Sequence, residues 1–279
     1  MQTKPNLFKQ VFQKQIAFPS DHGSWVFLLS PLLIGIFTSR TWSSDILYLV
    51  LGLLAAFFLR QPAAVAVKAF AKRRSKQVLP SALFWMAGYS AIGLIAIVQL
   101  ILRGYHTLLW LLIPGGAVFI WHLWLVSKRS ERHRMGVDII ASGTLALAAP
   151  AAYWVSLGES SPLGWLMWIL AWLQSAASIV YAFLRLSQRK LSESPIKSEL
   201  LIIGRRALMY SGFNLFFSIA LSFYTQLPDL IWLPYLLQFA ETYRGVTVPA
   251  IGQKPTSIGF RQLVVSTIFT VLFILVWYL

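Results

Sequence analysis

Long apolar segments separated by short basic connections are the feature of this sequence that most limits its fold. Of its 279 residues, 57% are hydrophobic and 12% are charged, whereas soluble globular domains carry roughly 25% charged residues. A helix needs roughly 20 apolar residues to cross a bilayer, and its backbone polar groups must pair within the segment. We therefore predict an all-α polytopic membrane protein, a bundle of about nine transmembrane helices, at about 24–40, 45–60, 81–102, 107–126, 137–156, 163–186, 207–224, 228–243 and 262–279.

The basic residues predict the direction in which these helices run. Lys and Arg gather in the cytoplasmic loops of membrane proteins. With these nine spans, 22 of the 24 Lys and Arg residues fall in the amino-terminal leader and in every second loop after it. The amino terminus is therefore predicted to be cytoplasmic and the carboxyl terminus to lie on the opposite side.

The same distribution explains the net charge of +15 without a nucleic-acid partner, because the positive charge follows the topology and the leaflet surface. We expect membrane lipids as partners and no nucleic acid. The chain contains no Cys, which excludes disulfides and thiolate metal sites. A bacterial cytoplasmic membrane is the expected location, and a thylakoid-type membrane follows the same charge rule.

Residues 1–23 are predicted to form a cytoplasmic leader ahead of a single transmembrane domain over 24–279. The leader lacks the apolar core of a signal peptide. Phe8, Val11, Phe12 and Ile16 share one helical face, a pattern typical of a helix that lies on an anionic leaflet. An unstructured leader is the alternative.

Mid-span polar groups are the first candidates for a function. Charged residues are costly inside a bilayer, and the predicted span centres instead contain uncharged groups: Gln99, Gln174, Ser178, Asn214 and Gln238. Hydrogen bonds between helices explain such residues in most membrane bundles. A ligand cavity is the alternative.

Basic side chains at the predicted cytoplasmic ends of spans two, six and seven are candidates for binding an anionic ligand, because a guanidinium holds phosphate through paired hydrogen bonds. The predicted ligand-binding residues are Arg60, Lys68, Tyr181, Arg185, Arg205 and Arg206. The alternative is that these residues only snorkel to the interface and set the topology.

Three titratable residues are candidates for catalysis. His22 precedes the first span and could titrate near neutral pH, although anchoring of the helix by the adjacent Trp25 also accounts for this stretch. Asp138 opens span five, where the helix dipole favours a carboxylate. Glu241 ends span eight close to Arg244 and could form a local ion pair with it. A lone His makes no metal site, and no metal-binding residues are predicted.

The opening of the chain resembles the YwiC-like family of bacterial membrane proteins. The resemblance rests on residues 19–25, which read Pro-Ser-Asp-His-Gly-Ser-Trp, on the stretch from Pro31 to Gly35, and on Arg60-Gln61-Pro62. The nine-span layout is compatible with a match over nearly the whole chain. This resemblance supplies little mechanism.

More distantly, the layout is similar to the UbiA-type prenyltransferases, which also have nine helices and a cytoplasmic amino terminus. The resemblance implies an active site framed by the loops after spans two and six, where aspartate-rich motifs hold magnesium against an isoprenoid diphosphate. This chain instead reads Arg60-Gln61-Pro62-Ala63-Ala64-Val65-Ala66-Val67-Lys68 at the first motif and Ser178-Ile179-Val180-Tyr181-Ala182-Phe183-Leu184-Arg185 around the second. Magnesium requires oxygen ligands, so we expect no magnesium site of this type.

The leading functional hypothesis is a UbiA-like protein that binds an isoprenoid or lipidic ligand, such as a quinone, pigment or lipid precursor, in a cavity that opens to the cytoplasmic side, without magnesium-dependent prenyl transfer. The alternatives are an assembly or scaffolding factor for a membrane-protein complex, a non-classical prenyl or acyl transferase, and a transporter. If the protein is an enzyme, the resemblance implies a prenyltransferase-like transferase. The ligand, the cofactor, the oligomeric state and the limits of spans two and eight stay open at this point.

Overall fold

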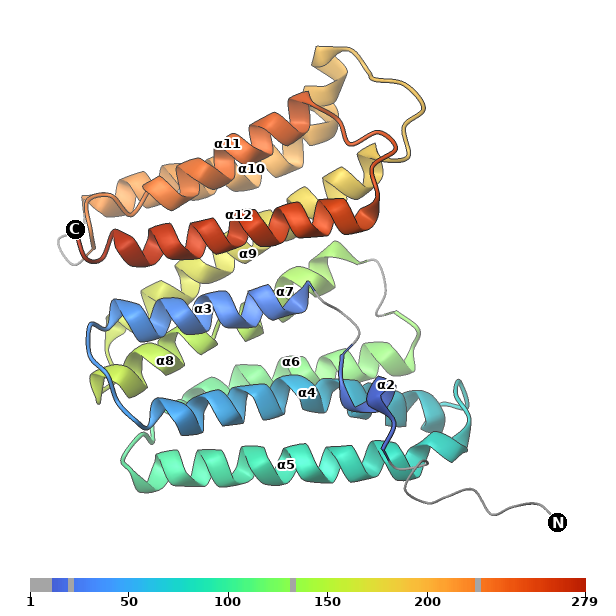
Figure 1. Ribbon diagram of the computed structural model, residues 1–279, viewed down its shortest axis with the longest axis vertical. Coiled ribbons are helices and arrows are strands. Elements are labelled where there is room, and N and C mark those ends of the chain that lie inside the picture. Colours follow the sequence, from blue (N-terminus) through green and yellow to red (C-terminus); the bar gives the residue numbers. More distant parts are fainter. Residues whose placement is uncertain (1–11, 20–22, 131–133, 224–226) are drawn as a thin grey trace. The chain divides into compact units, whose positions relative to one another are not determined.

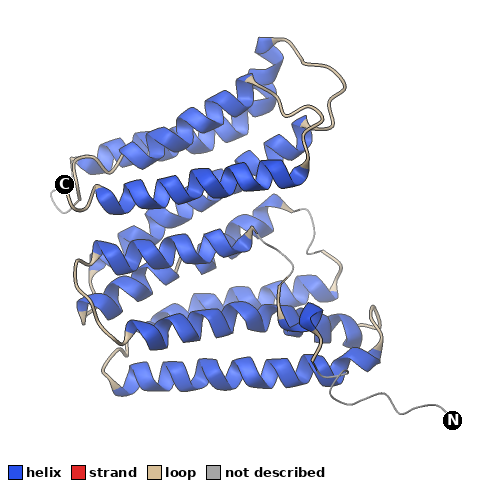
Figure 2. Ribbon diagram, in the orientation of Figure 1, coloured by secondary structure: helices blue, strands red, loops and turns tan. Residues whose placement is uncertain are grey.

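Helices are the only regular elements of the computed structural model over the residues that it describes, which are 12–19, 23–130, 134–223 and 227–279 (Figures 1 and 2). Within these ranges, six segments are long and apolar enough to cross a membrane: α4 (Ile46–Phe70), η1 (Lys76–Val78) with α5 (Leu79–Leu102), α6 (Leu108–Ser127), α7 (Met135–Leu145) with α8 (Ala148–Leu157), α9 (Pro162–Gln188) and α12 (Pro255–Leu275). The chain is therefore an all-α polytopic membrane protein.

Four other helices complete the described part of the chain. α3 (Ser24–Thr38) is apolar but shorter than these six segments. α10 (Lys197–Ser222) and α11 (Leu233–Thr247) contain more polar residues, and α2 (Lys14–Ala17) is a single turn. Helices thus lie at all nine predicted positions, although several boundaries differ. The orientation across the membrane stays a prediction.

The chain forms two compact units. Unit 1 comprises Met1–His22 and Trp42–Arg134 and contains α2, α4, α5 and α6. Unit 2 comprises Gly23–Thr41 and Met135–Leu279 and contains α3 and the helices from α7 to α12. The prediction of a single domain over 24–279 stays a prediction.

The second predicted span extends ten residues further than expected. α4 continues through Arg60, Gln61 and Pro62 and ends at Phe70. Pro62 removes only its own N–H from the helix ladder, and the Ala-rich stretch that follows it favours helix. Arg60 and Lys68 therefore lie on a helix, and the loop predicted over about 61–80 is short.

Two later helices begin earlier than predicted, because their first turns contain polar residues. α10 begins at Lys197 instead of 207, so that Arg205 and Arg206 lie inside it, and the loop predicted over about 187–206 is correspondingly shorter. α12 begins at Pro255 instead of 262 and includes Arg261. Pro234 does not break the eighth helix, because it lies in the first turn of α11, where the backbone N–H groups have no partner within the helix.

The fifth span is divided into α7 and α8. Pro150 has no N–H for the carbonyl of Ala146, which instead accepts from the N–H of Ala149 at 3.0 Å in a tighter turn. α3 packs closely against α8 here: a Cβ on Gly35 would lie 2.2 Å from the carbonyl oxygen of Ala149. The small residues of this span thus allow the two helices to approach closely.

Unit 1 holds an amino-terminal strap, residues 12–18, against α4 and α5. Ile16 is fully buried beside Ala66 and Ala82. The hydroxyl of Tyr89 donates to the carbonyl of Ala17 at 3.1 Å, and the Gln61 side chain donates to the carbonyl of Gln15 at 3.1 Å. The prediction of an interfacial leader helix rests partly on Phe8 and Val11, which lie outside the described residues.

Candidate functional site

A polar face on α9 is the local feature from which the candidate site is built. α9 is apolar enough to span a membrane, yet polar residues recur on it every three to four positions, which places them on one side of the helix. They are Gln174, Ser178, Tyr181, Arg185 and Gln188, and all of them are buried. α9 contacts α11 and α12 within unit 2.

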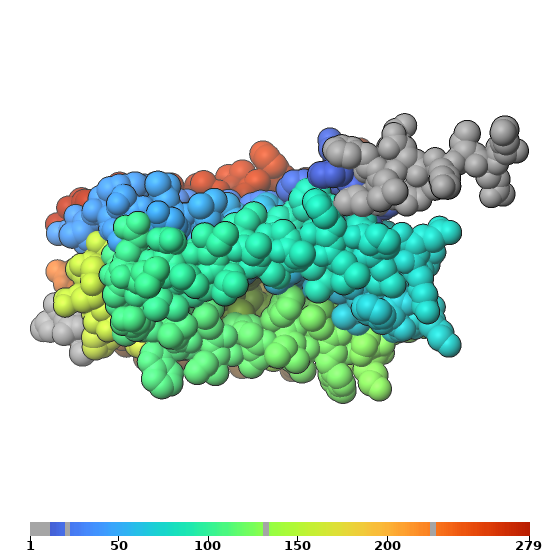
Figure 3. Space-filling model, turned by 90° about the horizontal axis from the view of Figure 1, so that it is seen from below, coloured from blue at the N-terminus to red at the C-terminus, as the bar shows by residue number. Residues whose placement is uncertain are grey.

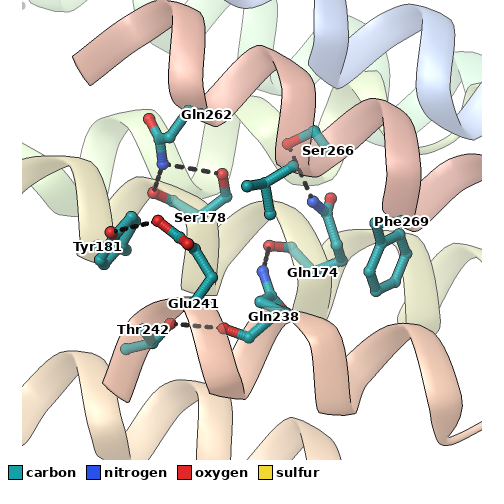
Figure 4. Close-up of a pocket in the computed structure, with 10 residues that line it drawn as sticks. Gln174, Ser178, Tyr181, Gln238, Glu241, Thr242, Gln262, Ser266 and Phe269 are labelled. Atoms are coloured by element: carbon teal, nitrogen blue, oxygen red, sulfur yellow. Dashed lines mark hydrogen bonds between the residues drawn. The ribbon is translucent and has the colours of Figure 1, made fainter. Parts of the chain in front are cut away.

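The polar face of α9 lines a small pocket that is completed by α11 and α12 (Figure 4). Its lining residues are Gln174, Ser178, Tyr181, Gln238, Glu241, Thr242, Gln262, Val265, Ser266 and Phe269. The cavity volume is about 20 Å³, which is enough for one water molecule or a group of similar size. Gln174 lies 14 positions before the end of α9 at Gln188, or about 21 Å along the helix axis at 1.5 Å per residue.

A charged cluster forms one end of the pocket. Arg261 Nε donates to Glu241 Oε1 at 2.6 Å, and Arg261 Nη2 donates to Glu241 Oε2 at 2.7 Å. The hydroxyl of Tyr181 donates to Glu241 Oε1 at 2.8 Å. The side chains of Arg261 and Glu241 are 40% and 12% exposed. Bidentate pairing of this kind neutralises the carboxylate and fixes its orientation. The partner of Glu241 is therefore Arg261 on α12, and not Arg244, the neighbour considered from the sequence.

Amide side chains form the rest of the pocket wall. Gln262 Nε2 donates to the backbone oxygen of Ser178 at 2.5 Å and to its hydroxyl at 3.1 Å. Gln174 Nε2 donates to Ser266 Oγ at 3.4 Å, and Gln238 Nε2 donates to the Gln174 carbonyl at 2.9 Å. Gln238 Oε1 is buried and has no hydrogen-bond partner among the described residues. All of these glutamine bonds join two helices, as the sequence interpretation favoured, but the acceptor Gln238 Oε1 is left without a donor among the described residues.

Arg185 secures the adjacent end of α11. Its Nη1 donates to the carbonyls of Gly245 and Val248, each at 2.6 Å, and to Gln188 Oε1 at 2.9 Å. Carbonyls at a helix carboxyl end attract a positive charge. Gly245 is required here because a Cβ would lie 2.3 Å from the Tyr181 hydroxyl. Arg185 thereby holds α11 against α9 and positions Glu241.

The structure brings together only some of the predicted site residues. Tyr181 and Glu241 line the pocket, and Arg185 lies one turn further along α9. Arg205 and Arg206 are exposed on α10, and Asp138 is exposed on α7. Arg60 and Lys68 belong to α4 of unit 1, with the Arg60 guanidinium 5.3 Å from the centre of the Phe57 ring. His22 lies outside the described residues.

Sequence reasoning missed the contribution of α12. Arg261, Gln262, Val265, Ser266 and Phe269 follow the spacing of one helical face, and this periodicity was the available signal. The predicted ninth span begins at 262, so Arg261 falls in the loop before it and the face is incomplete in the sequence prediction. Among the described residues, no group of three or more His, Asp or Glu side chains is placed to hold a metal ion, and the expected lack of a magnesium site stays a prediction.

Comparison with known proteins finds a family-model match in the first part of the chain. Residues 18–153, a little under half of the sequence, match the family model described as YwiC-like protein. This match confirms the resemblance seen in the opening residues. No curated protein and no solved structure matches the chain, and the similarity to UbiA-type enzymes stays a prediction.

Proposed function

We propose that this YwiC-like membrane protein binds a lipid-soluble ligand, of the isoprenoid or lipid class, whose polar end enters the pocket between α9, α11 and α12. The observation that carries the proposal is a pocket with polar walls inside a membrane-spanning unit, with Gln238 Oε1 left without a partner. Buried polar groups are normally satisfied by protein, water or ligand. A buried polar atom that lacks a partner beside a cavity therefore supports a binding site.

The size of the pocket supports a ligand that enters only in part. A volume of about 20 Å³ holds one small polar group, so the remainder of the ligand must lie outside it. The outer faces of α11 and α12 are apolar, with Leu236, Leu263, Val264 and Ile268 exposed. A hydrocarbon tail that lies against these side chains stays in an apolar environment, as the acyl chain of a lipid does.

The charges around the pocket support binding without magnesium-dependent prenyl transfer. The one carboxylate in the pocket, Glu241, already accepts two bonds from Arg261 and one from Tyr181. A diphosphate–magnesium site needs several free oxygen ligands. Glu241 is therefore a positioning group in this proposal, and the protein acts as a binder or carrier of its ligand.

The loop charges support access from the cytoplasmic side of a bacterial inner membrane. Arg189, Lys190 and Lys254 lie beyond the ends of α9 and α11 that are nearest to Glu241. Positive loops face the cytoplasm. The pocket then lies between this interface and the middle of the bilayer.

Photo-crosslinking of the full chain in lipid nanodiscs tests the proposal. The probe is farnesol that carries a diazirine on its tail, and peptide mapping locates the label. We expect labelling of peptides from α9, α11 and α12, which excess unlabelled farnesol removes. Labelling that is spread over all helices and does not respond to excess farnesol would overturn the proposal.

Two serine substitutions provide a matched pair for this experiment. Ser266 is buried in the pocket wall, whereas Ser127 lies at the end of α6 in unit 1, is not among the pocket residues and bonds to the Trp124 carbonyl of its own helix. Ser266→Leu fills the pocket and is expected to lower competable labelling at least fivefold, and Ser127→Leu is expected to leave it unchanged. The competition in the wild type keeps the test valid if Ser266→Leu folds poorly.

A further inference from the structure

The side-chain amide of Gln238 is the buried polar group whose bonds are incomplete. Its residue is 6% exposed and lies in the middle of α11. Its Nε2 donates to the carbonyl of Gln174, and this bond fixes which way the amide points. Its Oε1 is buried without a partner among the described residues, and a buried acceptor left in this way is unfavourable.

None of the neighbouring donors in the described part of the chain bonds to Gln238 Oε1. Gln262 Nε2 bonds to Ser178, and Gln174 Nε2 bonds to Ser266. The Tyr181 hydroxyl donates to Glu241, and the Thr242 hydroxyl donates to the backbone carbonyl of Gln238. What the pocket lacks at Gln238 is therefore a donor.

The chemistry of the walls decides which kind of donor suits the pocket. An ether, a ketone or a quinone carbonyl has no hydrogen to donate. A cationic amine would lie near the Arg261 guanidinium, and Glu241 is already neutralised by that residue. An anionic phosphate would face Gln238 Oε1, which also carries negative partial charge. A neutral hydroxyl satisfies Gln238 without a new charge.

We propose that the ligand is a lipid-soluble alcohol whose hydroxyl donates to Gln238 Oε1, an inference that rests on the proposed function. The hydroxyl enters the pocket between α9, α11 and α12, and its carbon chain stays against the apolar outer faces of the helices. Gln238 is then the residue that distinguishes an alcohol from its ether or carbonyl analogue.

The test compares two competitors that differ by one hydrogen-bond donor. Farnesol and farnesyl methyl ether each compete with the diazirine-bearing farnesol on the full chain in nanodiscs. We expect the ether to compete about tenfold more weakly in the wild type, which is the effect of one lost hydrogen bond of about 1.4 kcal/mol. In Gln238→Leu the two competitors should become equal.

A glutamine in unit 1 supplies the matched control. Gln99 lies on α5 and is not among the residues that line the pocket, so Gln99→Leu should keep the tenfold preference for farnesol. If the ether competes as well as farnesol in the wild type, or if Gln238→Leu keeps the preference, the alcohol inference is wrong while the proposed function stands. If neither competitor removes the label, the proposed function itself fails.

Discussion

α5 of unit 1 and α9 of unit 2 are similarly long apolar helices that differ in where their side chains lie. In the most apolar 18-residue window, 17% of the α5 segment is buried, compared with 61% of α9. α5 and α6 expose large apolar side chains such as Ile95, Leu102 and Trp110, and both helices contribute to the face shown in Figure 3. α9 buries glutamines, serines and an arginine. Apolarity therefore identifies both as membrane helices, but buried polar groups distinguish the helix that lines the candidate site.

The two units also contain ion pairs with nearly the same exposure and different geometry. Arg103 and Asp45 of unit 1 are 41% and 15% exposed and share one bond of 3.0 Å. Arg261 and Glu241 of unit 2 are 40% and 12% exposed and share two bonds. Asp45 precedes α4 and Arg103 follows α5, whereas both residues of the second pair lie within helices. The comparison predicts that removing the arginine of each pair lowers the free energy of unfolding by different amounts.

The largest expected difference in stability between the two units comes from breaking each ion pair. Arg261→Leu leaves Glu241 without its bidentate partner and should lower the free energy of unfolding by about 2–3 kcal/mol, less than for a fully buried pair because Arg261 is partly exposed. Arg103→Leu should cost about 1 kcal/mol or less. Denaturant unfolding in detergent measures both. Equal losses in the two variants would contradict the distinction between the units.

Substitution of one glycine in each unit gives the next largest expected difference in stability. Gly245→Ala places a Cβ 2.3 Å from the Tyr181 hydroxyl and should cost about 1–3 kcal/mol through overpacking. It should also loosen the bond between Tyr181 and Glu241.

Gly88 on α5 is the matched position in unit 1, because a Cβ there meets nothing within 4 Å. Gly88→Ala should be neutral or stabilising by up to about 1 kcal/mol, since Ala favours helix. Thermal unfolding of the two variants side by side checks the pair. A Gly245→Ala protein as stable as Gly88→Ala would show that α11 does not pack this closely.

The sequence carries enough information for the fold class, because apolar length and loop charge act over whole segments. It also identifies Tyr181 and Glu241 as candidates, because both lie at predicted cytoplasmic ends of spans, where polar side chains can meet the polar part of a ligand. The beginning of α12 is not predicted, because residues 255–261, which read Pro-Thr-Ser-Ile-Gly-Phe-Arg, have the composition of a loop. The lack of a partner for Gln238 Oε1 depends on how three helices pack around it. No local sequence pattern encodes that packing.

The smallest expected effect concerns the amino-terminal strap of unit 1. Tyr89→Phe removes the bond to the carbonyl of Ala17 and should cost about 1 kcal/mol, with faster hydrogen exchange in residues 12–18. Tyr243→Phe, at an exposed position on α11, should leave that exchange unchanged. Unaltered exchange in Tyr89→Phe would show that the aromatic contacts alone hold the strap.

The central claim is that the pocket of unit 2 receives the polar end of a lipid-soluble ligand. A crystal structure of the protein grown in lipid with farnesol tests it most directly. The account predicts an oxygen atom of the ligand within hydrogen-bond distance of Gln238 Oε1, with the farnesol chain along α11 and α12. A closed pocket in which a protein group donates to Gln238 Oε1, with farnesol absent or bound elsewhere, would contradict it.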